Sequence, residues 1–292
     1  MLDVRAAFTT ISFCMLTSAG ASAGTGKPPA PLAPSSKWQL DYGMSECRLL
    51  RSFGEGRDRI TLQLGRGYLE DVVEMALASA RIPSSEGYVD VSVGTTTVEK
   101  VPGMRARGFD AGRKTSSVLR FRPDQDLPRA LLSDAASGKP TVLKVAFVHG
   151  YAARLELGIM KNALASLDRC MDDLVKGWGL DPNEQRARRS APIPIDPPSK
   201  WFGAGDFPAN LNHAGVGAIV VIRLMTGSDG AVTGCTVAKS GGDEAFETLT
   251  CRLAIARARF RPAIGANGEP IASAWIQRID WRPGQPMFRF IG

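Results

Sequence analysis

The first half of the chain carries segments in which apolar and polar residues alternate, the pattern of a half-buried β-strand. In DRITLQL, Ile60, Leu62 and Leu64 alternate with polar neighbours, and GYVDVSVGT places three valines on one face. TVLKVAF repeats the pattern less cleanly, and KWQLDY and CRLLRSF are also strand-like. We therefore predict five strands in a first domain of residues 38–180.

This first domain ends in a segment whose apolar residues recur at helical spacing. In ELGIMKNALASLDRCMDDLVKGWG these residues are Ile159, Ala163, Leu167, Cys170, Met171 and Leu174. A stripe that repeats every three or four positions predicts an amphipathic helix with one buried face. We expect strands followed by closing helices, with Cys170 on the apolar face of the last helix.

The last part of the chain, residues 201–284, predicts a second α+β domain. GAIVVIRLMT reads as a strand buried on much of both sides, GSDG as a turn and AVTGCTVAKS as the return strand of a hairpin. Asp243 can cap a helix that runs to about Ala258, and Pro262 ends it. PIASAWIQRIDW supplies a third strand. The expected architecture is a small antiparallel three-stranded sheet with one covering helix.

Two Pro-rich segments separate these parts. Residues 24–37 predict a flexible, extended tail, and residues 181–200 predict a linker between the two domains. Because proline removes a backbone donor, we expect no regular helix or central strand in the linker. Its prolines are Pro182, Pro192, Pro194, Pro197 and Pro198.

The first 23 residues have the pattern of a secretory signal peptide. Arg5 precedes an apolar centre from Ala6 to Leu16, and Ala21-Ser22-Ala23 is the small-x-small pattern of a cleavage site. We predict export and cleavage after Ala23. The alternative is an uncleaved membrane anchor, but the apolar centre is shorter than the roughly 20 residues that a spanning helix needs.

Composition and charge add little to this prediction. Apolar residues make up 44% of the chain, enough for real cores, and the formal net charge is +7. The charges are spread along the chain without a basic block that alternates with aromatic residues, so nucleic acid is not an expected partner. Four arginines could meet an anionic cell-wall polymer or lipid headgroup, although a solvated helix face is the simpler interpretation: Arg252, Arg257, Arg259 and Arg261.

Removal of residues 1–23 leaves four cysteines, an even number that suits disulfides in an oxidising compartment. Three pairings of Cys47, Cys170, Cys235 and Cys251 are possible. We favour Cys47 with Cys170 and Cys235 with Cys251, because the linker separates the first two from the last two.

The helix of the second domain has two apolar stripes on nearly opposite sides. One stripe holds Phe246, Leu249, Leu253 and Ala256, and the other holds Cys251, Ala254, Ile255 and Ala258. Only the stripe with Cys251, turned inward, places that cysteine against the sheet. We therefore expect this stripe to face the sheet.

The chain lacks the sequence signatures of an enzyme. GxSxG, SxxK, HExxH and Walker motifs are absent, and the adjacent Asp172 and Asp173 would point in different directions on a helix. A CxxC motif is also absent, and His149 and His213 have no partner at metal-ligand spacing. We expect no catalytic site, no metal ion and no cofactor.

Four short motifs of the second domain occur in an order and spacing that are typical of a known family. They are Phe207-Pro208-Ala209 before a glycine and a strand, Ser228-Asp229-Gly230-Ala231-Val232 at the hairpin turn, Ser240 after the second strand, and Arg259-Phe260-Arg261-Pro262 after the helix. In this order and spacing the segment resembles the C-terminal domain of TonB-type proteins. The resemblance covers residues 201–282, a little over a quarter of the chain.

The resemblance implies a protein-binding module of the periplasm. In that family the edge of the sheet pairs with a short peptide of an outer-membrane receptor, in transport across the outer membrane. An extended peptide then adds to an exposed strand through backbone hydrogen bonds. We expect that edge to be the third strand, from Ile271 to Trp281, with four partner-binding residues: Trp275, Gln277, Arg278 and Asp280.

The chain departs from the family pattern at its start. Energy-transducing members keep an uncleaved membrane helix and a long Pro-rich spacer, whereas this chain has a cleavable start and a whole domain where the spacer would be. We therefore expect a periplasmic binding module, peripheral to the membrane at most, rather than a transducer anchored in the inner membrane. The alternative is a structural envelope protein that binds peptidoglycan and has no energy-coupling role.

Overall fold

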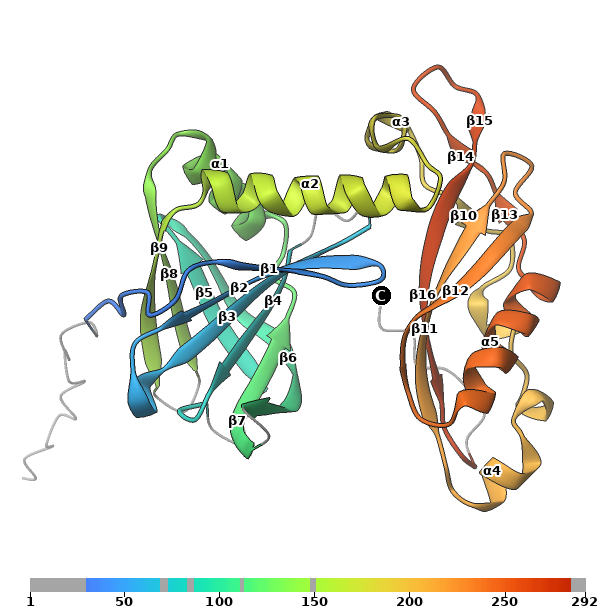
Figure 1. Ribbon diagram of the computed structural model, residues 1–292, viewed down its shortest axis with the longest axis horizontal. Coiled ribbons are helices and arrows are strands. Elements are labelled where there is room, and N and C mark those ends of the chain that lie inside the picture. The colour runs from blue at the N-terminus through green and yellow to red at the C-terminus, as the bar shows by residue number, and fades with distance from the viewer. Residues whose placement is uncertain (1–29, 69–72, 83–86, 111–112, 148–150, 285–292) are drawn as a thin grey trace, which may run out of the picture.

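The computed structural model describes residues 30–68, 73–82, 87–110, 113–147 and 151–284. It is a mixed structure of mostly antiparallel sheets and few helices, arranged as two lobes (Figure 1). Buried apolar side chains form two clusters, and we name the N-terminal lobe (30–187) and the C-terminal lobe (201–284) after them. The predicted signal peptide lies outside the described residues.

The N-terminal lobe is built on a nine-stranded antiparallel sheet of order β1-β2-β3-β4-β7-β6-β5-β8-β9. The five predicted strands are confirmed, and the sequence patterns missed β4, β6, β7 and β9. The strands are β1 (Gln39–Tyr42), β2 (Glu46–Phe53), β3 (Ile60–Gly67), β4 (Val73–Ser79), β5 (Tyr88–Val93), β6 (Thr96–Asp110), β7 (Arg113–Phe121), β8 (Pro140–Phe147) and β9 (Ala152–Ile159).

Two helices, α1 (Asp126–Ala136) and α2 (Lys161–Gly177), lie across one end of this sheet (Figure 1). Helix α2 buries the predicted stripe around Leu167, Cys170 and Met171. The expectation that Ile159 belongs to this stripe is wrong, because Ile159 ends β9 and is 60% exposed. Gly158, with φ of +72°, takes a conformation that a helix does not allow, so the helix begins only after it.

The expected flexible tail is wrong from residue 30 onward, because this segment joins two strands of the sheet. Leu32 forms a bridge to Leu155 of β9, and Pro34 forms one to Phe53 of β2. Arg51 of β2 also donates to the backbone oxygen of Leu157, at 3.0 Å. Residues 32–34 therefore connect strands that lie near opposite ends of the strand order.

The expectation of a linker without regular structure is also wrong. Helix α3 (Pro182–Ala187) begins at a proline, which is tolerated at the first helical position, and Asp181 caps it by accepting from the N–H of Asn183. Strand β10 (Ile193–Pro194) then pairs with β13 (Phe260–Arg261). The backbone of Ser190 bridges to Ile264. This segment is thus attached to the C-terminal lobe along much of its length.

The C-terminal lobe contains the predicted hairpin and closing strand. β11 (Ala218–Thr226) pairs with both β12 (Val232–Gly241) and β16 (Ser273–Trp281), which gives the order β12-β11-β16. Gly230 makes the hairpin turn with φ of +80°, and a Cβ there would collide with the backbone oxygen of Phe260. The smaller elements of this lobe are η2 (Pro198–Lys200), η3 (Ala204–Asp206), α4 (Ala209–His213), β14 (Ala263–Ile264) and β15 (Pro270–Ile271).

Helix α5 (Glu244–Arg257) covers one face of the three-stranded sheet, capped by Asp243 as predicted. The expected inward stripe is confirmed for Ala254 and Ala258, which are buried, and is wrong for Ile255. Phe246, Leu249, Thr250, Leu253 and Ala254 are buried, whereas Ile255 is 45% exposed. The bulky Phe246 and the leucines fill the space above the sheet, so Cys251 lies at the margin of this face.

Both favoured cysteine pairs are disulfide-bonded in the structure. Cys47 of β2 is bonded to Cys170 of α2, with a Cα–Cα distance of 6.2 Å. Cys235 of β12 is bonded to Cys251 of α5, with a Cα–Cα distance of 5.6 Å. Because β12 is the outer strand on that side, a cysteine at the margin of α5 reaches it.

The arginines that end α5 are engaged with the protein itself. Arg257 donates to both carboxylate oxygens of Asp206, at 2.5 and 2.9 Å, and to the backbone oxygen of Trp201. Arg259 donates to the backbone oxygens of Ala258 and Ile255 at the carboxyl end of the helix. Both contacts are structural and suit a cation at a helix C-terminus.

Removal of either disulfide should destabilise the fold, and the first should matter more. The Cys47–Cys170 bond spans 123 residues and the Cys235–Cys251 bond spans 16. In the chain-entropy model the losses are about 4 to 5 and about 3 kcal/mol. Urea unfolding of the two double serine variants, with the native protein as reference, measures the difference, and equal losses would contradict the ranking.

The variant Asp206→Asn should lower stability at neutral pH. A hydrogen bond from Arg257 is the largest cause that lowers the pKa of Asp206 below its usual range. Stability from a lowered carboxylate pKa is present above about pH 4 and is lost as pH falls through the folded-state pKa. The difference in unfolding free energy between native protein and variant should therefore shrink in urea titrations toward pH 3. A pH-independent difference would exclude the charge as its cause.

Candidate functional site

Strand β16 is an edge of the C-terminal sheet. It pairs with β11 on one side, from Ala218 opposite Trp281 to Thr226 opposite Ser273, and no described strand pairs with its other side. An edge strand presents unpaired N–H and C=O groups that another extended chain can use. This is the strand that the sequence predicted as the binding edge.

The four candidate residues fall on the two faces of β16, as strand alternation requires. Trp275 and Gln277 share the face that α5 covers, where the Trp275 ring packs 5.7 Å from that of Phe260. The Trp275 Nε1–H donates to Gln277 Oε1 at 3.3 Å. The structure thus brings these two side chains together against the core of the lobe.

Arg278 and Asp280 lie on the opposite face. Arg278 is exposed, and Asp280 accepts two hydrogen bonds from Arg282, at 2.6 and 3.1 Å. Charged side chains on an edge strand oppose unwanted pairing with other sheets. The candidate residues therefore form no single cluster of side chains, and what they share is the strand backbone.

Two hydrogen bonds show which backbone groups of β16 point away from β11. The backbone oxygen of Arg278 accepts from Gln277 Nε2 at 2.9 Å, and the backbone of Ala274 bonds to Tyr68. In an antiparallel pair the N–H and C=O of one residue point to the same side, and successive residues alternate. The groups of Ile276 and Asp280 should then point outward with those of Ala274 and Arg278.

Sequence reasoning missed a second set of residues at this strand. Tyr68 of the N-terminal lobe and Gln185 of α3 contact Ser273, the first residue of β16. All three are buried, at 8%, 1% and 0% exposure. A polar residue inside the linker and a tyrosine at the end of a strand carry no motif, so only the fold relates them.

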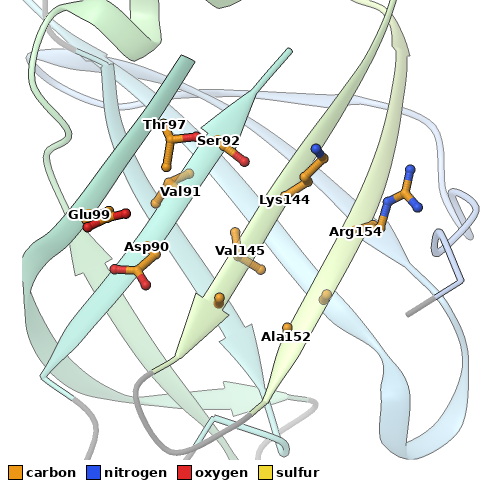
Figure 2. A pocket seen from close by; sticks show the side chains of 11 residues that line it. Asp90, Val91, Ser92, Thr97, Glu99, Lys144, Val145, Ala152 and Arg154 are labelled. Atoms are coloured by element: carbon orange, nitrogen blue, oxygen red, sulfur yellow. The ribbon is translucent and has the colours of Figure 1, made fainter. Parts of the chain in front are cut away.

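The N-terminal lobe has a separate hollow of about 300 Å³ on β5, β6, β8 and β9, shown in Figure 2. Asp90 and Glu99 lie on one side of it and Lys144 and Arg154 on the other. No hydrogen bond joins Ser92 in this hollow to a base among the described residues. An activated serine nucleophile needs such a base, so we do not assign Ser92 as a nucleophile.

Other site classes have no structural support in the described residues. No three His, Cys, Asp or Glu side chains are grouped so that they could hold a metal ion. His213 is exposed on α4, and His149 lies outside the described part of the chain. A search of the same residues for a helix that is long and apolar enough to cross a membrane finds none.

Comparison with known proteins locates the resemblance in the C-terminal lobe. No curated protein and no solved structure matches the chain. One family model does match, over the stretch that runs from η3 through β16. Domains of this family interact with proteins of the bacterial envelope and are not enzymes. By this match, residues 204–283 are similar to the Gram-negative bacterial TonB protein C-terminal domain.

Proposed function

We propose that the C-terminal lobe binds an extended peptide of a partner protein by β-strand addition to β16. The observation that carries this proposal is the free edge of β16, with outward backbone groups, inside a segment that matches the TonB C-terminal family. The partner in this proposal is the peptide of an outer-membrane receptor, which links the protein to transport across the outer membrane.

Backbone pairing fits the chemistry of this edge better than a side-chain pocket does. Trp275 and Gln277 are occupied with the lobe itself, and Asp280 is paired with Arg282. In strand addition the main chain supplies the affinity, and nearby side chains select the partner. Arg278 is the exposed side chain that a bound strand would meet.

We also propose that the protein works in the periplasm after cleavage at Ala23. Two disulfide bonds support this location, because disulfides form and persist in oxidising compartments. N-terminal sequencing of the fractionated protein tests it. A soluble periplasmic chain that starts at Gly24 is the expected result, and an intact Met1 in the inner membrane would contradict it.

The variant Arg278→Pro should abolish most of the binding while the fold is kept. Proline removes the outward N–H of residue 278 and leaves the bonds between β16 and β11 intact, and edge strands tolerate proline in this position. Loss of one backbone hydrogen bond, about 1.4 kcal/mol, should weaken receptor binding about tenfold. Recovery of receptors from outer-membrane extract by the immobilised protein measures the change.

Two variants control this experiment. Arg278→Ala removes the side chain but keeps the N–H, so it should bind within a few-fold of the native protein. Gln277→Pro removes a donor to β11 and should instead lower the unfolding free energy. Full binding by Arg278→Pro would contradict strand addition. Sedimentation on purified cell wall without recovery of receptors would favour the structural, peptidoglycan-binding alternative.

A further inference from the structure

The start of β16 is occupied by the N-terminal lobe. The Tyr68 hydroxyl donates to Gln185 Oε1 at 2.8 Å and lies 3.2 Å from Ser273 Oγ, which donates to the same Gln185 oxygen at 2.8 Å. We call these three residues the interlobe cluster. It joins the nine-stranded sheet, α3 and β16 in one buried network.

The backbone of β16 takes part in this network. Gln185 Nε2 donates to the backbone oxygen of Ala272 at 2.9 Å, just before the strand. The backbone of Ala274 forms a hydrogen bond that lowers the pKa of Tyr68, although burial dominates and raises that pKa overall. The outward backbone group of Ala274 is therefore already used within the protein.

Apolar packing covers the same end of the sheet. Ala274, 3% exposed, belongs to the core cluster of the N-terminal lobe, and Met225 and Ile276 pack against that cluster. All three lie on the face of the C-terminal sheet that α5 does not cover. A partner strand beside Ala274 would have to displace this packing.

A cation–π contact holds the neighbouring strand to the same lobe. The Arg223 guanidinium of β11 lies 4.4 Å from the centroid of the Trp178 ring, just after α2. It also donates to the backbone oxygen of Met44 at the tip of the β1–β2 hairpin, at 3.1 Å. Burial lowers the pKa of Arg223, which shows that the contact is partly desolvated.

Separation of the lobes at this point would be costly. It would break the hydrogen bonds of the interlobe cluster, and any of its polar groups that stayed buried without a partner would be strongly unfavourable. It would also expose the apolar contacts of Ala274 and Ile276. A short peptide that binds at Ala274 would therefore have to offset the free energy lost with these hydrogen bonds and apolar contacts.

We propose that the N-terminal lobe sets the length and frame of the partner strand, by occupying the first part of β16 and leaving only Gln277–Trp281 open. This inference rests on the proposed strand addition. The open part presents the N–H of Arg278 and the outward groups of Asp280, while the C=O of Arg278 accepts from the Gln277 side chain. The fitting partner is therefore a short extended segment of about five residues, roughly 17 Å long. A longer strand would meet Tyr68 and Ile276.

Residue-resolved amide exchange by NMR tests this inference on the full chain. The probe is the peptide acetyl-Thr-Val-Thr-Val-Thr-Val-amide, which offers a backbone for pairing without charged side chains. In the native protein the peptide should slow exchange of the Arg278 and Asp280 amides at least fivefold and leave that of Ala274 unchanged. In Tyr68→Phe the Ala274 amide should exchange faster in the absence of peptide, because the substitution removes the oxygen to which this amide is bonded.

Tyr151→Phe is the matched control, because Tyr151 is also partly buried in the N-terminal lobe but stacks on Phe147 away from β16. It should behave as the native protein does. An unchanged Ala274 amide in peptide-free Tyr68→Phe would overturn the inference while leaving strand addition intact. The inference would also be overturned if the peptide slowed exchange of the Ala274 amide in the native protein. A peptide that slows no β16 amide in any variant would overturn strand addition and this inference with it.

Discussion

The architecture of the C-terminal lobe depends on the position of β11 between α5 and the N-terminal lobe. Val220, Ile222 and Leu224 face α5, whereas Arg223 and Met225 on the alternate positions meet the N-terminal lobe. A strand with two covered faces cannot shift its register by one residue, because each side chain would then change faces. The position of β16 along β11 is fixed in the same way, and so are the groups that its outer edge presents.

Several elements of the C-terminal lobe were predictable from sequence. The hairpin, α5 and β16 carry local signals: a Gly turn, an Asp cap and alternating apolar residues. The facing of α5 was not predictable, because its two stripes have similar apolar character. The facing is set by contacts such as that of Phe246, whose ring centroid lies 5.4 Å from that of Trp281, a residue distant in the sequence.

The linker and the interlobe cluster show the other limit of sequence reasoning. Five prolines suggested an irregular segment, yet one of them begins a helix, since the first helical N–H has no partner in any case. In the interlobe cluster, Tyr68 lies 117 positions before Gln185 and 205 positions before Ser273. A network closed over such separations has no local pattern, and only the topology of the fold brings its members together.

The bridge made by residues 32–34 has a consequence for the order of assembly. These residues emerge early from a chain that is made from its N-terminus, but one of their partners, Leu155, lies in β9, the last strand of this sheet in the sequence. Such non-local pairing is slow to form, because the intervening loop must close first. The N-terminal lobe can therefore complete its sheet only after β9 has followed. Until then Leu32 lacks its bridge partner and stays available to other chains, so the growing chain passes through a stage that is exposed to misassembly.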